Sequence, residues 1–180
     1  MLECKWGRRF RLPSLRRTLW RAGHRTASVS ERAAHLIPRY TRCGMNLACK
    51  QEELALLLRE TTFTRNFGFS LDRIEDGGCT IHVPFQTAFE RPGGIVSGQV
   101  FMAASDVAMW LAIKTKLGMA EESVTAEMKT SFLSAARNED FRCTARVLKV
   151  GRRLIYGTAE CVGSNGRLFT HSTLTYIRVD

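Results

Sequence analysis

Asp106 is the single charged residue between Gly98 and Ile113, in a run that is otherwise neutral and mostly apolar. An ionised carboxylate in apolar surroundings is costly unless it is paired or hydrated. Acids kept in such places often act as general bases or nucleophiles, and we favour such a role for Asp106. A structural interpretation competes with it, in which Asp106 caps a local turn or meets an arginine across a subunit interface.

Gly98 stands where this apolar run begins, and it has no side chain to block close approach to its N–H. The first N–H groups of a helix are unpaired and lie at its positive end, so they can stabilise an oxyanion. Gln99 N–H could be a second donor. Ser97 is typical of an N-cap, and we do not expect it to be a nucleophile, because no His–Asp partner pattern accompanies it.

Arginines supply candidate anion contacts in two places. Arg91 lies in the loop before the run, where contact with a substrate carboxylate or phosphate and simple exposure to solvent are both open. "KVGRR" holds Lys149, Arg152 and Arg153 at a turn. Guanidinium groups suit phosphate geometry, so this turn could bind the phosphates of a ligand; a solvated hairpin turn is the alternative.

Two helices are predicted. The run from about Ser97 to Leu117 is too long for a strand, is followed by Gly118, and is apolar nearly all round, so this helix should be buried. "KQEELALLLRETTF" (50–63) predicts a shorter helix with leucines on one side. "QTAFERPGGIVSG" (86–98), between them, contains Pro and Gly residues that disfavour regular structure.

The remaining segments alternate as strands do. Residues 67–85 predict a hairpin with its turn at Asp76-Gly77-Gly78, and four strands follow in 123–133, 140–151, 153–163 and 167–179. Short turns make neighbouring strands antiparallel. We therefore predict an α+β domain in which a curved antiparallel β-sheet wraps a long central helix. Two sets of residues should each share one strand face: Val124, Ala126, Met128, Thr130 and Phe132, and Phe141, Cys143, Ala145 and Val147.

The order of these motifs resembles the hotdog-fold thioesterase superfamily. "VSGQVFMAASDVAM" is similar to the PaaI-like motif of His-Gly-Gly followed by Asp, with Ser97-Gly98-Gln99 in place of His-Gly-Gly and Asp106 at the right spacing, seven residues lying between it and Gly98. "VTAEMKTSFLSAA" resembles the next strand of that family, and "VLKVGRRLIYGTAECVGSNGRLFTHSTLTY" its last hairpins. The resemblance covers roughly residues 60 to 178.

This resemblance implies an acyl-CoA thioesterase. Asp106 would be the general base or the nucleophile, Gly98 would stabilise the oxyanion, and Thr125 would be the hydroxyl residue that holds the water. It also implies that two protomers share each site, in a homodimer or homotetramer, and no metal or redox cofactor. Ser97, Gln99, Arg91, Arg152 and Arg153 are the candidate contacts to substrate or CoA.

Residues 1–44 differ from the rest of the chain. They hold eleven Lys or Arg residues against two acids, whereas residues 45–180 hold sixteen basic and fifteen acidic residues. We expect this head to be disordered, because it has little apolar surface to offset its ordering entropy. We favour a disordered tail, or a true start at Met45 with the upstream residues assigned in error, over a mitochondrial presequence, and a nucleic-acid arm is the weakest interpretation. Residues 45–180 then form one domain.

Other features limit the function classes. The six cysteines are scattered without a C-x-x-C pair, so no zinc site is expected, and no long apolar run predicts a membrane span. We expect a cytoplasmic protein, or a mitochondrial one if the head is a presequence. Two alternatives to the thioesterase remain. One is a non-catalytic acyl-CoA binder or sensor; the other is a hydratase, which the lack of any His between His82 and His171 counts against.

Overall fold

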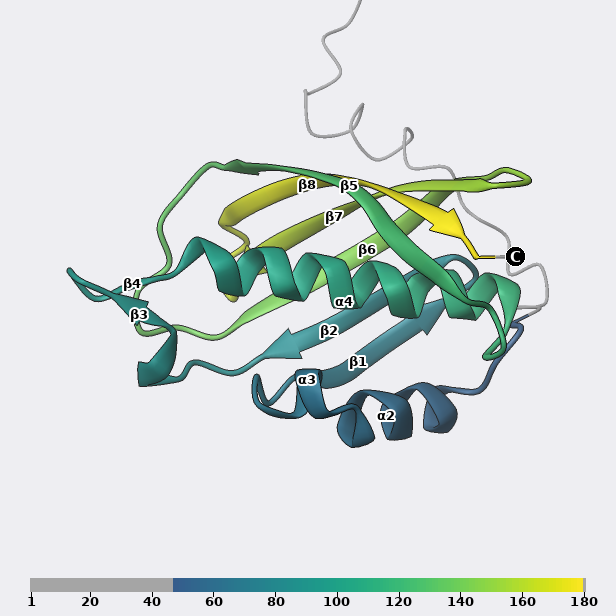
Figure 1. Ribbon diagram of the computed structural model, residues 1–180. Coiled ribbons are helices and arrows are strands. Elements are labelled where there is room, and N and C mark those ends of the chain that lie inside the picture. Colours follow the sequence, from purple (N-terminus) through teal and green to yellow (C-terminus); the bar gives the residue numbers. More distant parts are fainter. Residues whose placement is uncertain (1–46, 180) are drawn as a thin grey trace, which may run out of the picture. The chain divides into compact units, whose positions relative to one another are not determined.

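A computed structural model describes residues 47–179, and the proposals on residues 1–44 lie outside this range. Helix α4 (Gly98–Leu117) lies across one face of a six-stranded antiparallel sheet with the order β1-β2-β6-β7-β8-β5 (Figure 1). The curved antiparallel sheet around a long helix is the predicted architecture. The strands are β1 (Ser70–Glu75), β2 (Gly78–Val83), β5 (Ser123–Phe132), β6 (Phe141–Val150), β7 (Leu154–Gly163) and β8 (Leu168–Arg178).

Helix α4 has the predicted bounds because its ends carry the expected signals. Ser97 is extended and its Oγ accepts a hydrogen bond from Gln99 N–H at 3.4 Å, so it is the N-cap. Gly118 ends the helix at a φ of 93°, which favours glycine. Most of the helix between them is buried, as its all-round apolar sequence requires.

The sheet closes on α4 with alternate residues. In β6, Phe141, Cys143 and Ala145 are buried and Val147 is packed on the core, so this predicted face is confirmed. Phe101 of α4 lies between Phe141 and Phe169 of β8, with ring centroids 4.7 and 5.8 Å away. This aromatic contact fixes the first turns of α4 against the sheet.

The predicted face of β5 is wrong at Val124 and Ala126. Val124 lies opposite the exposed Ile177, whereas Thr125 lies opposite the buried Tyr176. The register shifts between Thr125 and Glu127, so Met128, which packs on the core, and Thr130 face α4 again. This β-bulge adds one residue to the strand and reverses the alternation before it, which a strict period of two cannot anticipate.

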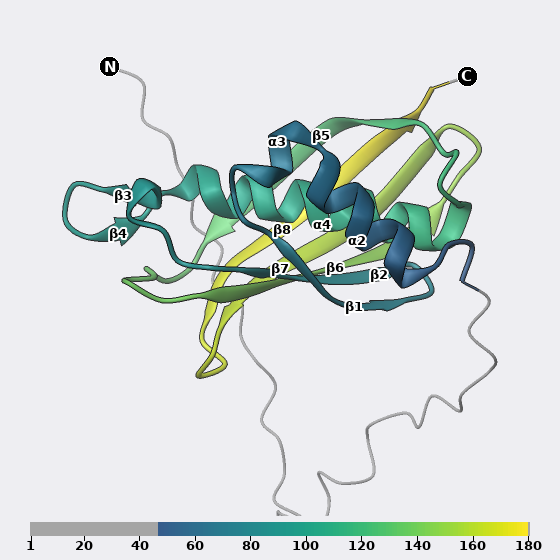
Figure 2. The same cartoon turned by 90° about the horizontal axis from the view of Figure 1, so that it is seen from below.

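The N-terminal helices and the 86–98 loop differ slightly from prediction. The helix expected over 50–63 is α2 (Gln51–Glu60) followed by one turn, α3 (Thr62–Arg65). Helix α2 lies beside β1, and α3 lies farther from that strand (Figure 2). The loop contains a 3-10 turn, η2 (Thr87–Phe89), and an unexpected two-strand ladder of β3 (Glu90–Arg91) and β4 (Ile95–Val96). The Pro and Gly residues occupy the turn of this ladder instead of preventing it.

Candidate active site

The start of α4 offers one backbone donor. Val100 N–H donates to Ser97 O at 3.1 Å and Gln99 N–H to Ser97 Oγ at 3.4 Å. Within the described residues Gly98 N–H donates to no acceptor, so it is better placed than Gln99 N–H to receive an oxyanion. An unpaired N–H at the positive end of a twenty-residue helix is suited to stabilising a negative oxygen.

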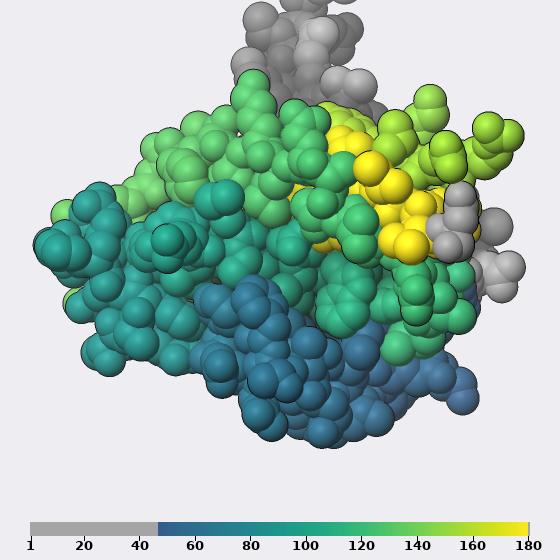
Figure 3. All heavy atoms as spheres, in the orientation of Figure 1, coloured from purple at the N-terminus to yellow at the C-terminus, as the bar shows by residue number. Residues whose placement is uncertain are grey.

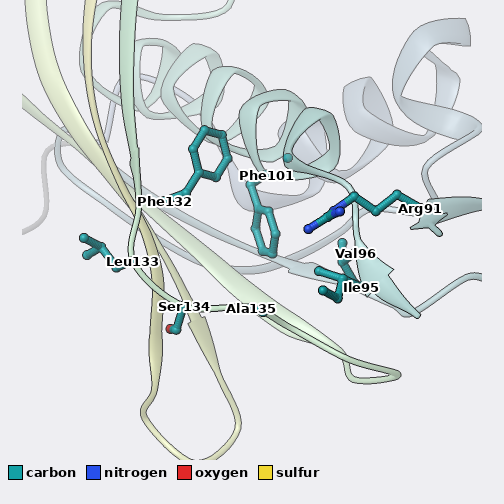
Figure 4. A pocket seen from close by; sticks show the side chains of 9 residues that line it. Arg91, Ile95, Val96, Phe101, Phe132, Leu133, Ser134 and Ala135 are labelled. Carbon is teal, nitrogen blue, oxygen red and sulfur yellow. The ribbon is translucent and has the colours of Figure 1, made fainter. Parts of the chain in front are cut away.

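A cavity of about 400 Å³ opens in front of this donor. We call it the Gly98 cavity. Arg91 extends from β3 across it toward Phe101, and the ring of Phe132 lies by the start of α4 (Figure 4). Apart from Arg91 and Ser134 the side chains of the wall are apolar, and the lining residues are Arg91, Ile95, Val96, Gly98, Phe101, Phe132, Leu133, Ser134 and Ala135. The cavity thus combines an apolar surface with one cation.

Asp106 lies two turns further along α4 and is held by hydroxyl groups. Thr125 Oγ1 donates to Asp106 Oδ1 at 2.7 Å, and Tyr176 Oη donates to the same oxygen at 2.6 Å. The side chain of Asp106 is only half-buried. Its charge is therefore stabilised by neutral donors and partial hydration, and no arginine forms an ion pair with it among the described residues.

Tyr176 is the residue of this site that the sequence interpretation missed. It is 2% exposed, and a buried tyrosine hydroxyl requires a hydrogen-bond partner. Burial, and then the negative charge of Asp106, raise the pKa of Tyr176 above its ordinary value, so the hydroxyl remains a donor. The sequence signal for Tyr176 is its inward position in the alternation of the last strand. That position indicates a buried polar group but does not identify its hydrogen-bond partner.

A second cavity, of about 280 Å³, surrounds Asp106. We call it the Asp106 cavity. The aromatic side chains of Phe63 and Trp110 form part of its wall, and the lining residues are Thr61, Phe63, Thr64, Asp106, Val107, Trp110, Ser123, Val124, Thr125 and Tyr176. It shares no residue with the Gly98 cavity. At about 1.5 Å per residue, eight residues along α4 separate Gly98 from Asp106 by roughly 12 Å.

Arg152 and Arg153 lie far from Gly98. They follow β6, whose end is beside the β1–β2 turn, where Val147 N–H donates to Gly77 O at 2.7 Å. Gly77 N–H in turn donates to Thr115 Oγ1, near the C-terminal end of α4. The structure therefore brings Arg91 to Gly98 and Thr125 to Asp106, but it places Arg152 and Arg153 at the other end of the helix.

Within residues 47–179, no group of three or more His, Cys, Asp or Glu side chains could hold a metal ion. No helix in that range is long and apolar enough to cross a membrane.

Known proteins match this fold and this segment. The family model of the thioesterase superfamily matches residues 93–170. A Saccharolobus solfataricus protein named "Putative esterase" is 30% identical over 95 residues, which are 53% of this chain and 67% of that protein. A conserved protein of Pseudomonas aeruginosa is 25% identical with a TM-score of 0.66, covering 72% of this chain and all of that one.

The fold has a structural counterpart in the PaaI protein of the Escherichia coli phenylacetic acid degradation operon. The TM-score is 0.64 and the matched region covers 73% of this chain and 97% of PaaI, although the identity is only 12%. The chain belongs to the thioesterase superfamily, and its fold is the hotdog fold. Both statements confirm what the motif order around Gly98 and Asp106 implied.

Proposed function

We propose that the protein hydrolyses acyl-CoA thioesters to a free acid and CoA. Membership of the thioesterase superfamily supports hydrolysis of a thioester in general. The observation that carries the specific proposal is the Asp106 carboxylate, fixed at one oxygen by two donors inside an otherwise uncharged cavity. The reaction consumes only water and the thioester, so it needs no metal or redox cofactor.

In the proposed reaction, Asp106 activates the attack on the thioester carbonyl. As a general base, its free oxygen takes a proton from water while the water oxygen bonds to the carbonyl carbon. Gly98 N–H stabilises the resulting oxyanion, the C–S bond then breaks, and the CoA thiolate leaves and is protonated. As a nucleophile, the same oxygen would bond to the carbon and form an anhydride that water hydrolyses. The proposal includes both routes, which use one oxygen of Asp106.

We further propose that two protomers complete each site. Gly98 and Asp106 of one chain line separate cavities, so a single carbonyl cannot reach both within one protomer. One face of α4 is not covered by the chain and is visible between β5 and α2 (Figure 3); Met102 on α4 is 40% exposed, and Asp106 and Trp110 are half-buried. Strand β5 is a free sheet edge beside it. A second copy packed on this face would cover apolar surface and bring Gly98 of one chain toward Asp106 of the other.

Arg91 has a supporting role in this proposal. It is the single charged side chain lining the Gly98 cavity and is itself exposed. A guanidinium at the mouth of an apolar cavity suits a substrate that is apolar at one end and carries phosphates at the other. Removal of this charge should weaken binding of CoA thioesters more than it slows the chemical step.

The test is hydrolysis of a panel of acyl-CoA thioesters by the full chain, followed by release of free thiol, with Asp106→Asn in parallel. The amide oxygen of Asn can still accept from Thr125 and Tyr176, so this variant should remain folded. Loss of a proton acceptor should cost about 10²- to 10⁴-fold in kcat. If the wild type hydrolyses no thioester but a CoA thioester raises its Tm, the protein is a binder and the enzymatic proposal is wrong.

A further inference from the structure

Two hydroxyl groups converge on one oxygen of Asp106. Thr125 Oγ1 and Tyr176 Oη lie 2.7 and 2.6 Å from Oδ1, and Tyr176 Oη is also 2.9 Å from the main-chain oxygen of Asp106. Among the hydrogen bonds of residues 47–179, none involves Oδ2 of Asp106. The two carboxylate oxygens are thus chemically unequal, because one is saturated with donors and the other is unoccupied by protein groups.

The sheet itself produces this convergence. Thr125 and Tyr176 are directly opposite each other on the neighbouring strands β5 and β8. Tyr176 faces α4 because its strand alternates regularly, and Thr125 faces it because the bulge follows directly after this residue. Without the bulge, an inward Met128 would require an outward Thr125. The bulge therefore sets the second donor in place, as bulges near functional sites often do.

The environment keeps both donors neutral. Burial and the charge of Asp106 raise the pKa of the Tyr176 phenol, so it does not ionise in the range where a carboxylate titrates. Among the residues that line the Asp106 cavity from α3, α4, β5 and β8, only Asp106 and Tyr176 are titratable. The orientation of the Asp106 carboxylate is therefore set by its hydroxyl donors, with little interference from nearby charges.

We propose that Tyr176, acting with Thr125, is a positioning residue that anchors Oδ1 of Asp106 and leaves Oδ2 as the reacting oxygen. The proposal rests on the proposed thioesterase function and adds a residue to it. Tyr176 contacts the carboxylate and the backbone of the same residue, so its hydroxyl fixes the side-chain torsion of Asp106 relative to α4. A carboxylate free to rotate would present Oδ2 to the carbonyl only part of the time.

The test compares Tyr176→Phe with Tyr156→Phe in the full-length protein. Tyr156 lies on the outer face of β7 and is 41% exposed, so its hydroxyl serves as a matched control. Tyr176→Phe should lower kcat about 10- to 100-fold, as expected for loss of a hydrogen bond to a charged group, with KM within about twofold. An unchanged kcat would overturn the proposal, as would an effect confined to KM.

A second variant guards against a folding defect in Tyr176→Phe. Replacement of Tyr176 by 3-fluorotyrosine adds one small atom and keeps the hydroxyl as a donor. Its kcat should stay within a few-fold of the wild-type value. A loss as large as that in Tyr176→Phe would mean that packing, and not the hydrogen bond, governs the rate.

The failure of this proposal can be separated from that of the thioesterase proposal. If the wild type hydrolyses no thioester, the proposed function is wrong, and the unfolding free energies of Asp106→Ala, Tyr176→Phe and the double variant still test the contact. Coupling between the two substitutions is expected, because each removes one partner of the same hydrogen bond. Additive effects would overturn the role of Tyr176 whether or not the protein is an enzyme.

Discussion

The ring of Phe132 lies against Gly98: a Cβ atom on Gly98 would be 3.0 Å from Cε1 and 3.1 Å from Cζ of that ring. Phe132 comes from the end of β5, and Gly98 is the first residue of α4. The glycine thus allows the close approach of an aromatic side chain, whereas its backbone conformation does not call for glycine. Gly98 and Phe132 both line the Gly98 cavity, so the ring lies beside the start of the helix.

Gly98→Ala should lower activity more than stability. The added methyl group displaces the Phe132 ring, which is 55% exposed and can move toward solvent at little cost in the free energy of unfolding. The moved ring and the methyl group would obstruct the approach of a carbonyl oxygen to the N–H. We expect kcat/KM for thioesters to fall about tenfold or more, since loss of one oxyanion donor costs about 10²- to 10³-fold.

Phe132→Ala is the control for this substitution. It opens the cavity without touching the helix end, so it should alter KM and leave kcat within a few-fold. The double variant Gly98→Ala/Phe132→Ala should remain as slow as Gly98→Ala, if the methyl group itself blocks the donor. A Gly98→Ala protein with wild-type kcat/KM would show that this N–H takes no part in catalysis.

Gly157→Ala should destabilise the whole domain. Gly157 faces α4 from β7, and a Cβ atom there would lie 2.4 Å from the main-chain oxygen of Arg146 and 2.4 Å from Cε of Met109. Met109 is flexible but fully buried, and the carbonyl group is part of the sheet, so neither can yield easily. Urea unfolding should show a loss of about 3 kcal/mol or more.

Thr158→Ala is the matched control for Gly157→Ala. Thr158 is the next residue of β7 and faces the outer side of the sheet, so its truncation should cost about 1 kcal/mol or less. Adding Met109→Leu to Gly157→Ala should recover little stability, because the Arg146 carbonyl group remains in place. Full recovery would mean that the side-chain contact alone excludes alanine.

The main helix and strands of the fold could be predicted because the spacing of apolar residues within each segment shows which side of it is buried. The run from Ser97 to Leu117 is apolar on every side, and only a helix enclosed by other elements can bury such a surface. The four later strands alternate and are joined by short turns, which requires an antiparallel sheet. Gly98 and Asp106 could be singled out for the same reason: one starts the helix, and the other is the charge inside it.

The remaining features depend on contacts between distant segments. The bulge after Thr125 places Thr125 opposite Tyr176 while Met128 still faces the core. No local pattern in β5 reveals this shift. Tyr176 is 70 residues from Asp106, so its hydrogen bond follows only from the strand order. The chemistry of the side chains alone suggests Arg152 and Arg153 as contacts to CoA, and the topology of β6 and β7 places them at the other end of α4 from Gly98.

The thiol of Cys79 should make stability fall at alkaline pH. Burial raises the pKa of Cys79 from 9.0 to about 12. Below pH 9.0 both the folded and unfolded chains hold the proton, so this group contributes no pH dependence. Between pH 9.0 and about 12 only the unfolded chain loses it. The free energy of unfolding should therefore fall by about 1.4 kcal/mol per pH unit from this group.

Cys79→Ala isolates this effect from the other groups that titrate at high pH. Urea unfolding of both proteins between pH 8 and pH 10.5 gives the difference in their free energies of unfolding. That difference should be constant below about pH 9 and then change in favour of the alanine variant, with the slope set by one proton. A difference independent of pH over the whole range would show that Cys79 is ionised as easily in the folded protein as in the unfolded chain.

Mixing two impaired variants should restore activity above that of either parent if protomers share the site. In a heterodimer of Asp106→Asn and Gly98→Ala chains, one site combines the intact Asp106 of one chain with the intact Gly98 of the other, and the second site carries both substitutions. Random exchange makes about half of the dimers mixed, with one good site in two, so activity should recover to about a quarter of the wild-type value.

This recovery depends on the arrangement of the two cavities and not on the identity of the substrate. If Gly98 and Asp106 served one carbonyl within a single chain, every chain in the mixture would lack one of them, and no activity would return. The control is a mixture of Asp106→Asn with Tyr176→Phe, whose substitutions both affect the Asp106 half of the site. In that heterodimer neither site gains an intact Asp106 anchored by Tyr176, so the rate should stay near the average of the two parent variants. In both mixtures the chains are unfolded and refolded together before the rate is measured.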